Sequence, residues 1–280
     1  MLVALLGAAV AAIAYGTATV LQAIGVQRMA AIPDGAALWT RLVAGRLYAF
    51  GLILDVLGFL ASVASLRTLP LFLVESAVAS SVAVTAVLAV LVLDLRLRHA
   101  EITALAVIGV GLVLLAVSAE PGPAHHAGAV AGWVLLGTVA LVALMLLIGL
   151  RDANSARASL ILATAAGAGY GLVGIAARAL EVRHPWWRTA ADPVLWALLA
   201  QGALAVIAYG FALHRGRVTT VAAITMVVET VFPAIVGLVF LGDAVRDHLT
   251  LLAVIGFVAT LAGSLALANQ AEVDAAEARS

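Results

Sequence analysis

Nine long apolar segments run through this sequence of 280 residues, and they decide what the chain can fold into. A helix needs about 20 mostly apolar residues to cross a bilayer. Strands of a membrane barrel would instead alternate polar and apolar residues over about ten positions. The sequence therefore predicts an all-α integral membrane protein of about nine helices. The segments are Leu2–Gly25, Leu42–Leu66, Pro70–Leu93, Ile102–Ser118, Ala129–Leu150, Ala158–Leu180, Pro193–Leu213, Thr219–Leu241 and Leu249–Ala268.

The composition excludes several classes of protein. Hydrophobic residues make up 65% of the chain and charged residues 11%, against about 45–50% and about 25% in soluble domains. Too few polar side chains remain to cover a soluble globule, so a soluble enzyme, a nucleic-acid-binding protein and a disordered chain are excluded. The chain has no Cys, which removes disulfides and thiolate metal sites. No catalytic constellation or cofactor motif stands out, and we expect neither an enzyme nor a cofactor.

The distribution of Arg predicts the orientation in the membrane. All 15 basic residues are Arg, and nine spans place the two termini on opposite faces. Loops rich in Arg and Lys stay in the cytoplasm. We therefore expect a cell-membrane protein with its N-terminus outside and its C-terminus inside. The N-terminal face would carry Arg67, Arg178, Arg183, Arg188 and Arg246, and the opposite face the other ten.

Two parts of the chain resemble each other. Ala106-Val107-Ile108-Gly109 recurs 147 residues later as Ala253-Val254-Ile255-Gly256. Tyr15-Gly16 recurs as Tyr170-Gly171. Helices rich in Ala and Val can match by chance, but the order of the matches along all four helices favours an internal repeat.

The number of helices would make this repeat inverted. Four helices return the chain to its starting face, and one further helix crosses over, so the second repeat begins on the other face. Inverted repeats recur in secondary transporters, whose substrate site lies between the repeats near the midplane. We expect two four-helix repeats over 1–118 and 156–268, a linker loop and linking helix over 119–155, and a polar C-terminal tail over 269–280.

The ends of the two repeats carry a family resemblance. The segment from Leu69-Pro70-Leu71 to Leu93-Asp94, with Ala106–Gly109 after it, resembles the last two helices of a repeat in the drug/metabolite transporter superfamily. Glu229-Thr230-Val231-Phe232-Pro233 through Leu241-Gly242-Asp243 does so too. That family commonly ends the helix with Leu-Gly-Glu, where this chain has Asp243. Its usual members have ten helices, which is the alternative for the fold.

Two branches of the superfamily are informative. The nine-helix count and the Gly51–Asp55–Gly58 region look closest to the NIPA-type magnesium transporters, which implies Mg²⁺ as a substrate. Gly16-Thr17 resembles the first helix of the small multidrug resistance proteins. Ile13 stands where that family has an essential Glu, so proton exchange through that carboxylate does not carry over.

Three acidic residues fall inside predicted spans: Asp55, Glu75 and Glu229. An ionisable group in the membrane costs roughly 2.5–3.5 kcal/mol and usually faces the protein interior or a water-filled cavity. No Arg or His lies deep in a predicted span to pair with them. Unpaired acids indicate cation binding or protonation, and Asp55 and Glu229 would be metal ligands if the ion is Mg²⁺.

Asp55 is predicted near the midplane, about 13 residues into its helix at about 1.5 Å per residue. Gly51 and Gly58 share its face, which lets a neighbouring helix approach closely. Asp55 is therefore a candidate ligand or, alternatively, a protonated side chain that is hydrogen-bonded within a tight helix contact. Glu75 lies five residues inside its span. It either lines a vestibule or is simply solvated at the interface.

Glu229 combines a carboxylate with a broken helix. Pro233, four residues later, has no N–H to bond the Glu229 carbonyl, and Gly237 continues the same face. Transporters coordinate ions with such freed carbonyls. We predict a site at Glu229 with a kink or hinge at Pro233 and Gly237. The alternative is an ordinary kink whose carbonyl is satisfied by Thr230 or water.

Tyr15, Tyr170 and Gln201 are further candidate binding residues inside spans, and Gln22 and Tyr209 could also line a cavity, although a Tyr in a helix more often packs. The main hypothesis is a secondary transporter of a small solute or cation, Mg²⁺ among them, that works by alternating access. One alternative is a proton-coupled exporter of an organic metabolite or drug. The other is a membrane scaffold or assembly protein. The expected partners are the substrate and the lipid bilayer, without nucleic acid, and a homodimer is compatible with the sequence.

Overall fold

The computed structural model describes residues 1–30, 38–93, 99–122, 129–180 and 187–277. Over these residues nine helices are long and apolar enough to cross a membrane. The chain is therefore a multi-pass, all-α membrane protein, as the apolar segments predicted. The helices are α1 (Leu2–Ala30), α2 (Leu38–Ser65), α3 (Leu71–Ala79), α4 (Ser81–Leu93), α5 (His99–Ser118), α6 (Ala129–Arg151), α7 (Ser155–Ala179), α8 (Trp187–Ala190), α9 (Pro193–Arg215), α10 (Val218–Phe240) and α11 (Thr250–Glu277).

The third predicted span is split into two helices. The sequence predicted one helix over Pro70–Leu93, but α3 ends at Ala79 and α4 begins at Ser81. The Ser76 hydroxyl donates to the Phe72 carbonyl, and the Ser80 hydroxyl to the Ala77 carbonyl. Ser side chains that bond the preceding turn in this way bend helices, which explains a break that hydropathy alone does not reveal.

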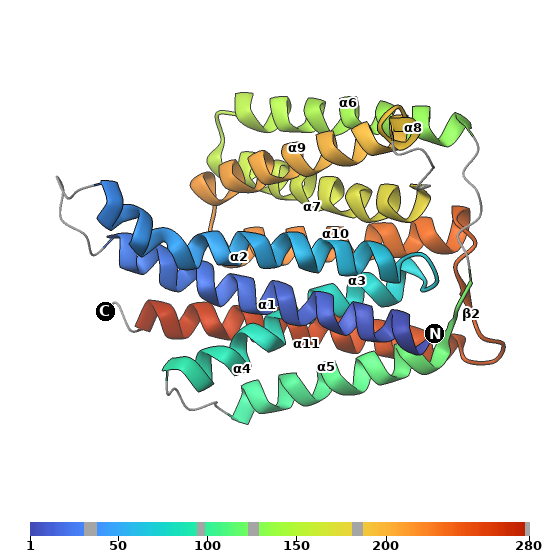
Figure 1. Ribbon diagram of the computed structural model, residues 1–280, viewed down its shortest axis with the longest axis horizontal. Coiled ribbons are helices and arrows are strands. Elements are labelled where there is room, and N and C mark those ends of the chain that lie inside the picture. Colours follow the sequence, from blue (N-terminus) through green and yellow to red (C-terminus); the bar gives the residue numbers. More distant parts are fainter. Residues whose placement is uncertain (31–37, 94–98, 123–128, 181–186, 278–280) are drawn as a thin grey trace.

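The helices form one bundle with the two termini at opposite ends (Figure 1). We call these ends the N-terminal face and the C-terminal face. Helices α6, α7 and α9 pack together, α1 packs on α2, and α5 on α11. Helix α10 packs on α7 and on α3. Two short strands, β1 (Ala119–Glu120) and β2 (Ala244–Val245), pair antiparallel at the N-terminal face.

The contact of α5 with α11 is reciprocal. A Cβ placed on Gly111 would lie 2.8 Å from the Gly256 carbonyl oxygen, and one on Gly256 would lie 2.8 Å from that of Gly111. The missing side chains therefore let the two backbones touch. Gly109, which matches Gly256 at the offset of 147 residues in the sequence, is exposed and has no heavy atom within 4 Å of its Cβ position.

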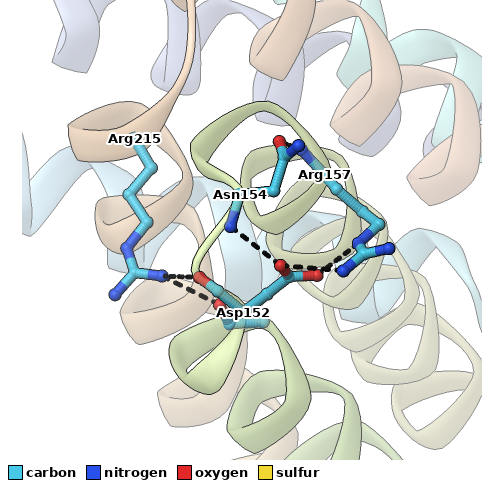
Figure 2. Close-up of polar contacts among 5 residues, drawn as sticks. Asp152, Asn154, Arg157 and Arg215 are labelled. Carbon is cyan, nitrogen blue, oxygen red and sulfur yellow. Dashed lines mark hydrogen bonds and ion pairs between the residues drawn. The ribbon is translucent and has the colours of Figure 1, made fainter.

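The C-terminal face carries a polar cluster around the turn between α6 and α7 (Figure 2). Arg157 donates through Nε to Asp152 Oδ2 at 2.5 Å, and this hydrogen bond holds the pKa of the Asp152 carboxyl below its usual range. Arg215, at the end of α9, donates to the carbonyls of Gly149, Leu150 and Asp152. These bonds join α6, α7 and α9 to one another.

Candidate functional site

A cavity of about 720 Å³ lies between α1, α2, α3, α7, α9 and α10. Three carboxylates line it, one each from α2, α3 and α10: Asp55, Glu75 and Glu229. Three tyrosines from α1, α7 and α9 also line it: Tyr15, Tyr170 and Tyr209. Apolar side chains, including Phe59, Val173 and Leu198, form much of the remaining wall. The structure thus brings together five of the six predicted binding residues, together with Tyr209.

Glu75 lies deeper than its place in the sequence indicated. Its side chain is buried, at 7% exposure, so the alternative of a carboxylate solvated at the interface is wrong. A Cβ at Gly174 would collide with Glu75 Oε1, and the carboxylate therefore occupies space that the glycine of α7 leaves open. Glu75 and Glu229 line the same cavity. Two carboxylates from different halves of the chain thus face one cavity.

The tyrosines are placed among these acids. Tyr15 lines the cavity together with Glu75, Asp55 and Glu229. Tyr170 lines it together with Glu229 and Tyr209. A phenol offers a ring face to a cation and a hydroxyl to a carboxylate. Side chains of this kind beside carboxylates suit a positively charged ligand.

Asp55 has a polar partner on the neighbouring helix. Gln22 Nε2 donates to Asp55 Oδ2 at 2.5 Å. A Cβ on Gly51 would lie 2.6 Å from Gln22 Cγ, and one on Gly58 would lie 3.3 Å from Ala14 Cβ. Both small residues therefore serve the close contact of α1 with α2. Asp55 is therefore compatible with both interpretations. It is hydrogen-bonded beside a tight helix contact, and it also lines the cavity, as a ligand would.

Pro233 lies inside α10, which continues through it to Phe240. The carbonyl of Glu229 approaches Gly171 of α7, where a Cβ would lie 3.3 Å from that oxygen. The Thr230 hydroxyl donates to the Met226 carbonyl at 2.8 Å, so it does not serve the carbonyl of Glu229. Thr230 is therefore excluded as the partner of the freed Glu229 carbonyl.

Gly237 serves a close contact at the N-terminal face. Its carbonyl accepts from the backbone N–H of Asp243 at 3.0 Å. A Cβ on Gly237 would overlap Asp243 Oδ2 and lie 3.1 Å from Leu71 Cβ. The contact of Gly237 with the Asp243 carboxylate was not foreseen from the sequence, which placed this glycine on the face of Glu229.

Gln201 is set apart from the other candidates. It is buried, at 1% exposure, and its Nε2 donates to Thr138 Oγ1 of α6 at 3.0 Å. It is not among the described residues that line the cavity. The sequence shows a polar residue within a span, but it does not show that this face of α9 packs on α6.

This placement gives a first prediction. We expect Gln201→Leu to change the free energy of unfolding by less than about 1 kcal/mol, because one hydrogen bond is lost while a buried Oε1 that has no hydrogen-bond partner is removed as well. Transport should stay at the level of the unaltered protein. Chemical denaturation and an uptake assay check this, and a stable variant that has lost transport would return Gln201 to the substrate path.

A second prediction concerns Gly174. The added methyl group of Gly174→Ala must displace the Glu75 carboxylate, whose far end is the atom in the way. We expect the variant to fold and to lose transport at least about tenfold, as is common when a binding group moves by about 1 Å. The matched control is Gly137→Ala in α6, where no heavy atom lies within 4 Å of the new Cβ. Equal transport by both variants would contradict the placement of Glu75.

Sequence reasoning missed an ion pair at the N-terminal face. Arg178, in the last turn of α7, lies 2.5 Å from Asp243, which follows α10. Both side chains are buried. Arg178 was assigned to the membrane surface from its place at the end of an apolar run. The Leu-Gly-Asp ending was the available signal, but a partner so far along the chain follows only from the packing of α7 on α10.

Over the described residues, no group of three or more His, Asp or Glu is close enough to hold a metal ion. Comparisons of this chain with models of protein families, with curated proteins and with solved structures give no match.

Proposed function

We propose that this protein is a secondary transporter that moves a small cationic solute through the central cavity. The single observation that carries the proposal is the convergence of Asp55, Glu75 and Glu229 on one cavity within the bundle. Carboxylates in a membrane interior are costly and usually mark substrate or ion paths. A scaffold or assembly protein has no need of them.

An inverted repeat in the manner of the drug/metabolite transporter superfamily fits the packing of the helices. Gly16 of α1 lies against α4, and Gly171 of α7 lies against α10. The tyrosine before each glycine lines the cavity. Helix α1 packs on α2 as α7 packs on α9. The reciprocal contact of Gly111 with Gly256 is also what a two-fold axis between the halves would produce.

The cavity extends from the acids toward the C-terminal face. An adjoining hollow of about 300 Å³ shares Glu75 and Glu229 with it and reaches Met226. A third hollow, of about 520 Å³, shares Met226 and reaches Thr220 and Asn269, close to that face. This arrangement supports a state that is open to the C-terminal face. From the distribution of Arg we infer that this face is cytoplasmic and that the N-terminal face lies outside the cell membrane.

An organic cation is the substrate class that the wall favours. The volume lies within the range of about 300–1,000 Å³ that is usual for small-molecule sites. Tyr15, Tyr170 and Tyr209 offer ring faces, which attract quaternary ammonium groups, while Phe59 and Leu198 offer apolar surface. The carboxylates supply the opposite charge.

Mg²⁺ is the second candidate, and the observation that favours it is that Glu75 and Glu229 together line both the cavity and the hollow that adjoins it. Mg²⁺ keeps several of its waters and binds through one or two carboxylates. A hydrated ion would use the volume of the cavity for these waters. The NIPA-type resemblance of the Gly51–Asp55–Gly58 region points the same way.

Thermal unfolding of the purified protein with added cations separates these candidates. A ligand that binds only the folded state stabilises it by about 2.7 kcal/mol at 100 times its Kd. We expect tetraethylammonium to raise Tm of the unaltered protein and to leave Tm of Glu229→Gln unchanged. A rise with Mg²⁺ alone would select the second candidate. If neither cation raises Tm, the cation site is wrong.

A further inference from the structure

The ion pair of Arg178 with Asp243 lies in the second half of the chain and is hydrogen-bonded to the first half at the N-terminal face. Arg178 Nη2 lies 2.5 Å from Asp243 Oδ1, and the two side chains are 1% and 0% exposed. Arg178 Nη1 also donates to the carbonyls of Leu66 and Leu69, at 2.5 and 2.6 Å. Asp243 Oδ2 accepts from the backbone N–H of Leu71 at 2.6 Å. One pair therefore ties the ends of α7 and α10 to the connection between α2 and α3.

Further contacts between the halves gather around this pair. Arg67 donates to the Leu180 carbonyl. The backbone N–H of Arg246 donates to the Ser118 carbonyl at 2.8 Å, next to the pairing of β1 with β2. At the opposite face, the polar cluster of Figure 2 joins α6, α7 and α9 and not the two halves. Polar contacts thus hold the two halves together at the N-terminal face.

The cavity ends against this ion pair. Leu66 and Ala177 line it. The Leu66 carbonyl is one of the acceptors of Arg178, and Ala177 precedes Arg178 in α7. From this end the hollows lead to the C-terminal face. An opening toward the N-terminal face must therefore separate the groups that Arg178 and Asp243 hold together.

The pair has the character of a contact that can be released. The attraction between two buried charges is largely offset by the cost of removing both from water. Arg178 Nε is buried and has no hydrogen-bond partner among the described residues. Exposure to water would satisfy this nitrogen as well as both charges. The closed and open states can therefore lie close in free energy.

We propose that Arg178 and Asp243 form the latch of the N-terminal face, which breaks each time the cavity opens to that side. In the proposed transporter, release of this latch produces the state that is open to the N-terminal face. The latch therefore rests on the proposed function. Its test needs no substrate, so a failure of the latch is distinguishable from a failure of the transport proposal.

Cysteine accessibility tests the latch. The chain has no Cys of its own, so Ala177→Cys places a single thiol in the cavity beside the latch. A membrane-impermeant, positively charged methanethiosulfonate is added to cells or to inverted vesicles. Asp247→Cys and Ala153→Cys, in exposed segments after α10 and α6, report which face the reagent reaches. We expect the thiol at 177 to react mainly from the C-terminal face.

Asp243→Asn or Arg178→Gln is then combined with Ala177→Cys. Each should raise the rate at which the thiol at 177 is labelled from the N-terminal face at least about tenfold, since the closed population falls when the pair is lost. Gly237→Ala keeps both charges but displaces the Asp243 carboxylate, and it should act in the same direction. If the charge variants do not fold, Gly237→Ala tests the latch in their place. The matched control is Arg157→Gln, which removes the ion pair at the other face and should change nothing. Unchanged labelling from the N-terminal face in a folded latch variant would overturn the proposal.

Discussion

Replacement of Glu229 by Gln is expected to abolish uptake, with a fall of at least about 100-fold in the initial rate. The cavity combines this carboxylate with Glu75, Tyr15 and Tyr170. Removal of the opposite charge from a buried cation costs about 3–5 kcal/mol, which is a factor of 100 or more in affinity. Gln keeps the size of the side chain, so packing of α10 on α7 should survive. Uptake of labelled tetraethylammonium into proteoliposomes measures the effect.

Glu120→Gln is the matched control for this substitution. Glu120 lies in β1, is exposed and does not line the cavity among the described residues. The same chemical change there should leave uptake within about twofold, as is usual for surface substitutions. If Glu229→Gln transports as well as Glu120→Gln does, Glu229 is not on the path.

Glu75→Gln is expected to remove transport while the protein keeps or gains thermal stability. The Glu75 side chain is buried against Gly174, and a buried ionised carboxylate is costly in the folded state. Its neutral amide analogue relieves that cost and fills the same space. Loss of transport at an unchanged or higher Tm would assign Glu75 a role in transport. Loss of a carboxylate that only stabilises the fold would instead lower Tm.

Uptake and Tm of Glu75→Gln are measured on the same preparation. A drop of Tm by several degrees with proportionate loss of uptake would assign Glu75 to packing alone. Asp55→Asn offers a graded comparison. Gln22 can still bond the new side chain, so we expect a smaller effect than either glutamate substitution gives.

Hydropathy was sufficient to predict the architecture, because each span satisfies its own backbone hydrogen bonds and shows as an uninterrupted apolar run. It was not sufficient for the break at Ser80, which depends on hydroxyl groups that bond the preceding turn. The sequence matches also did not show which glycines of α5 and α11 touch. In helices rich in Ala and Val, sequence matches hardly distinguish one glycine from another two residues away, whereas backbone contact does.

The acids of the cavity could be predicted because charge inside an apolar run is conspicuous. Asp55, Glu75 and Glu229 all line the cavity. The surroundings of each acid could not be predicted, since they depend on which helix faces which. Gln201 faces α6, Gly237 faces Asp243, and Tyr209 completes the cavity beside Tyr170. The ion pair of Arg178 and Asp243 was out of reach for the same reason.

Counterflow in proteoliposomes is the most direct test of the central claim that this cavity carries a cation by alternating access. Vesicles that hold the unaltered protein are loaded with unlabelled tetraethylammonium and diluted into a trace of labelled tetraethylammonium. We expect label to accumulate transiently above its external concentration, and we expect no such accumulation in vesicles that hold Glu229→Gln. Simple equilibration of label, or the same low signal as in protein-free vesicles, would contradict this claim.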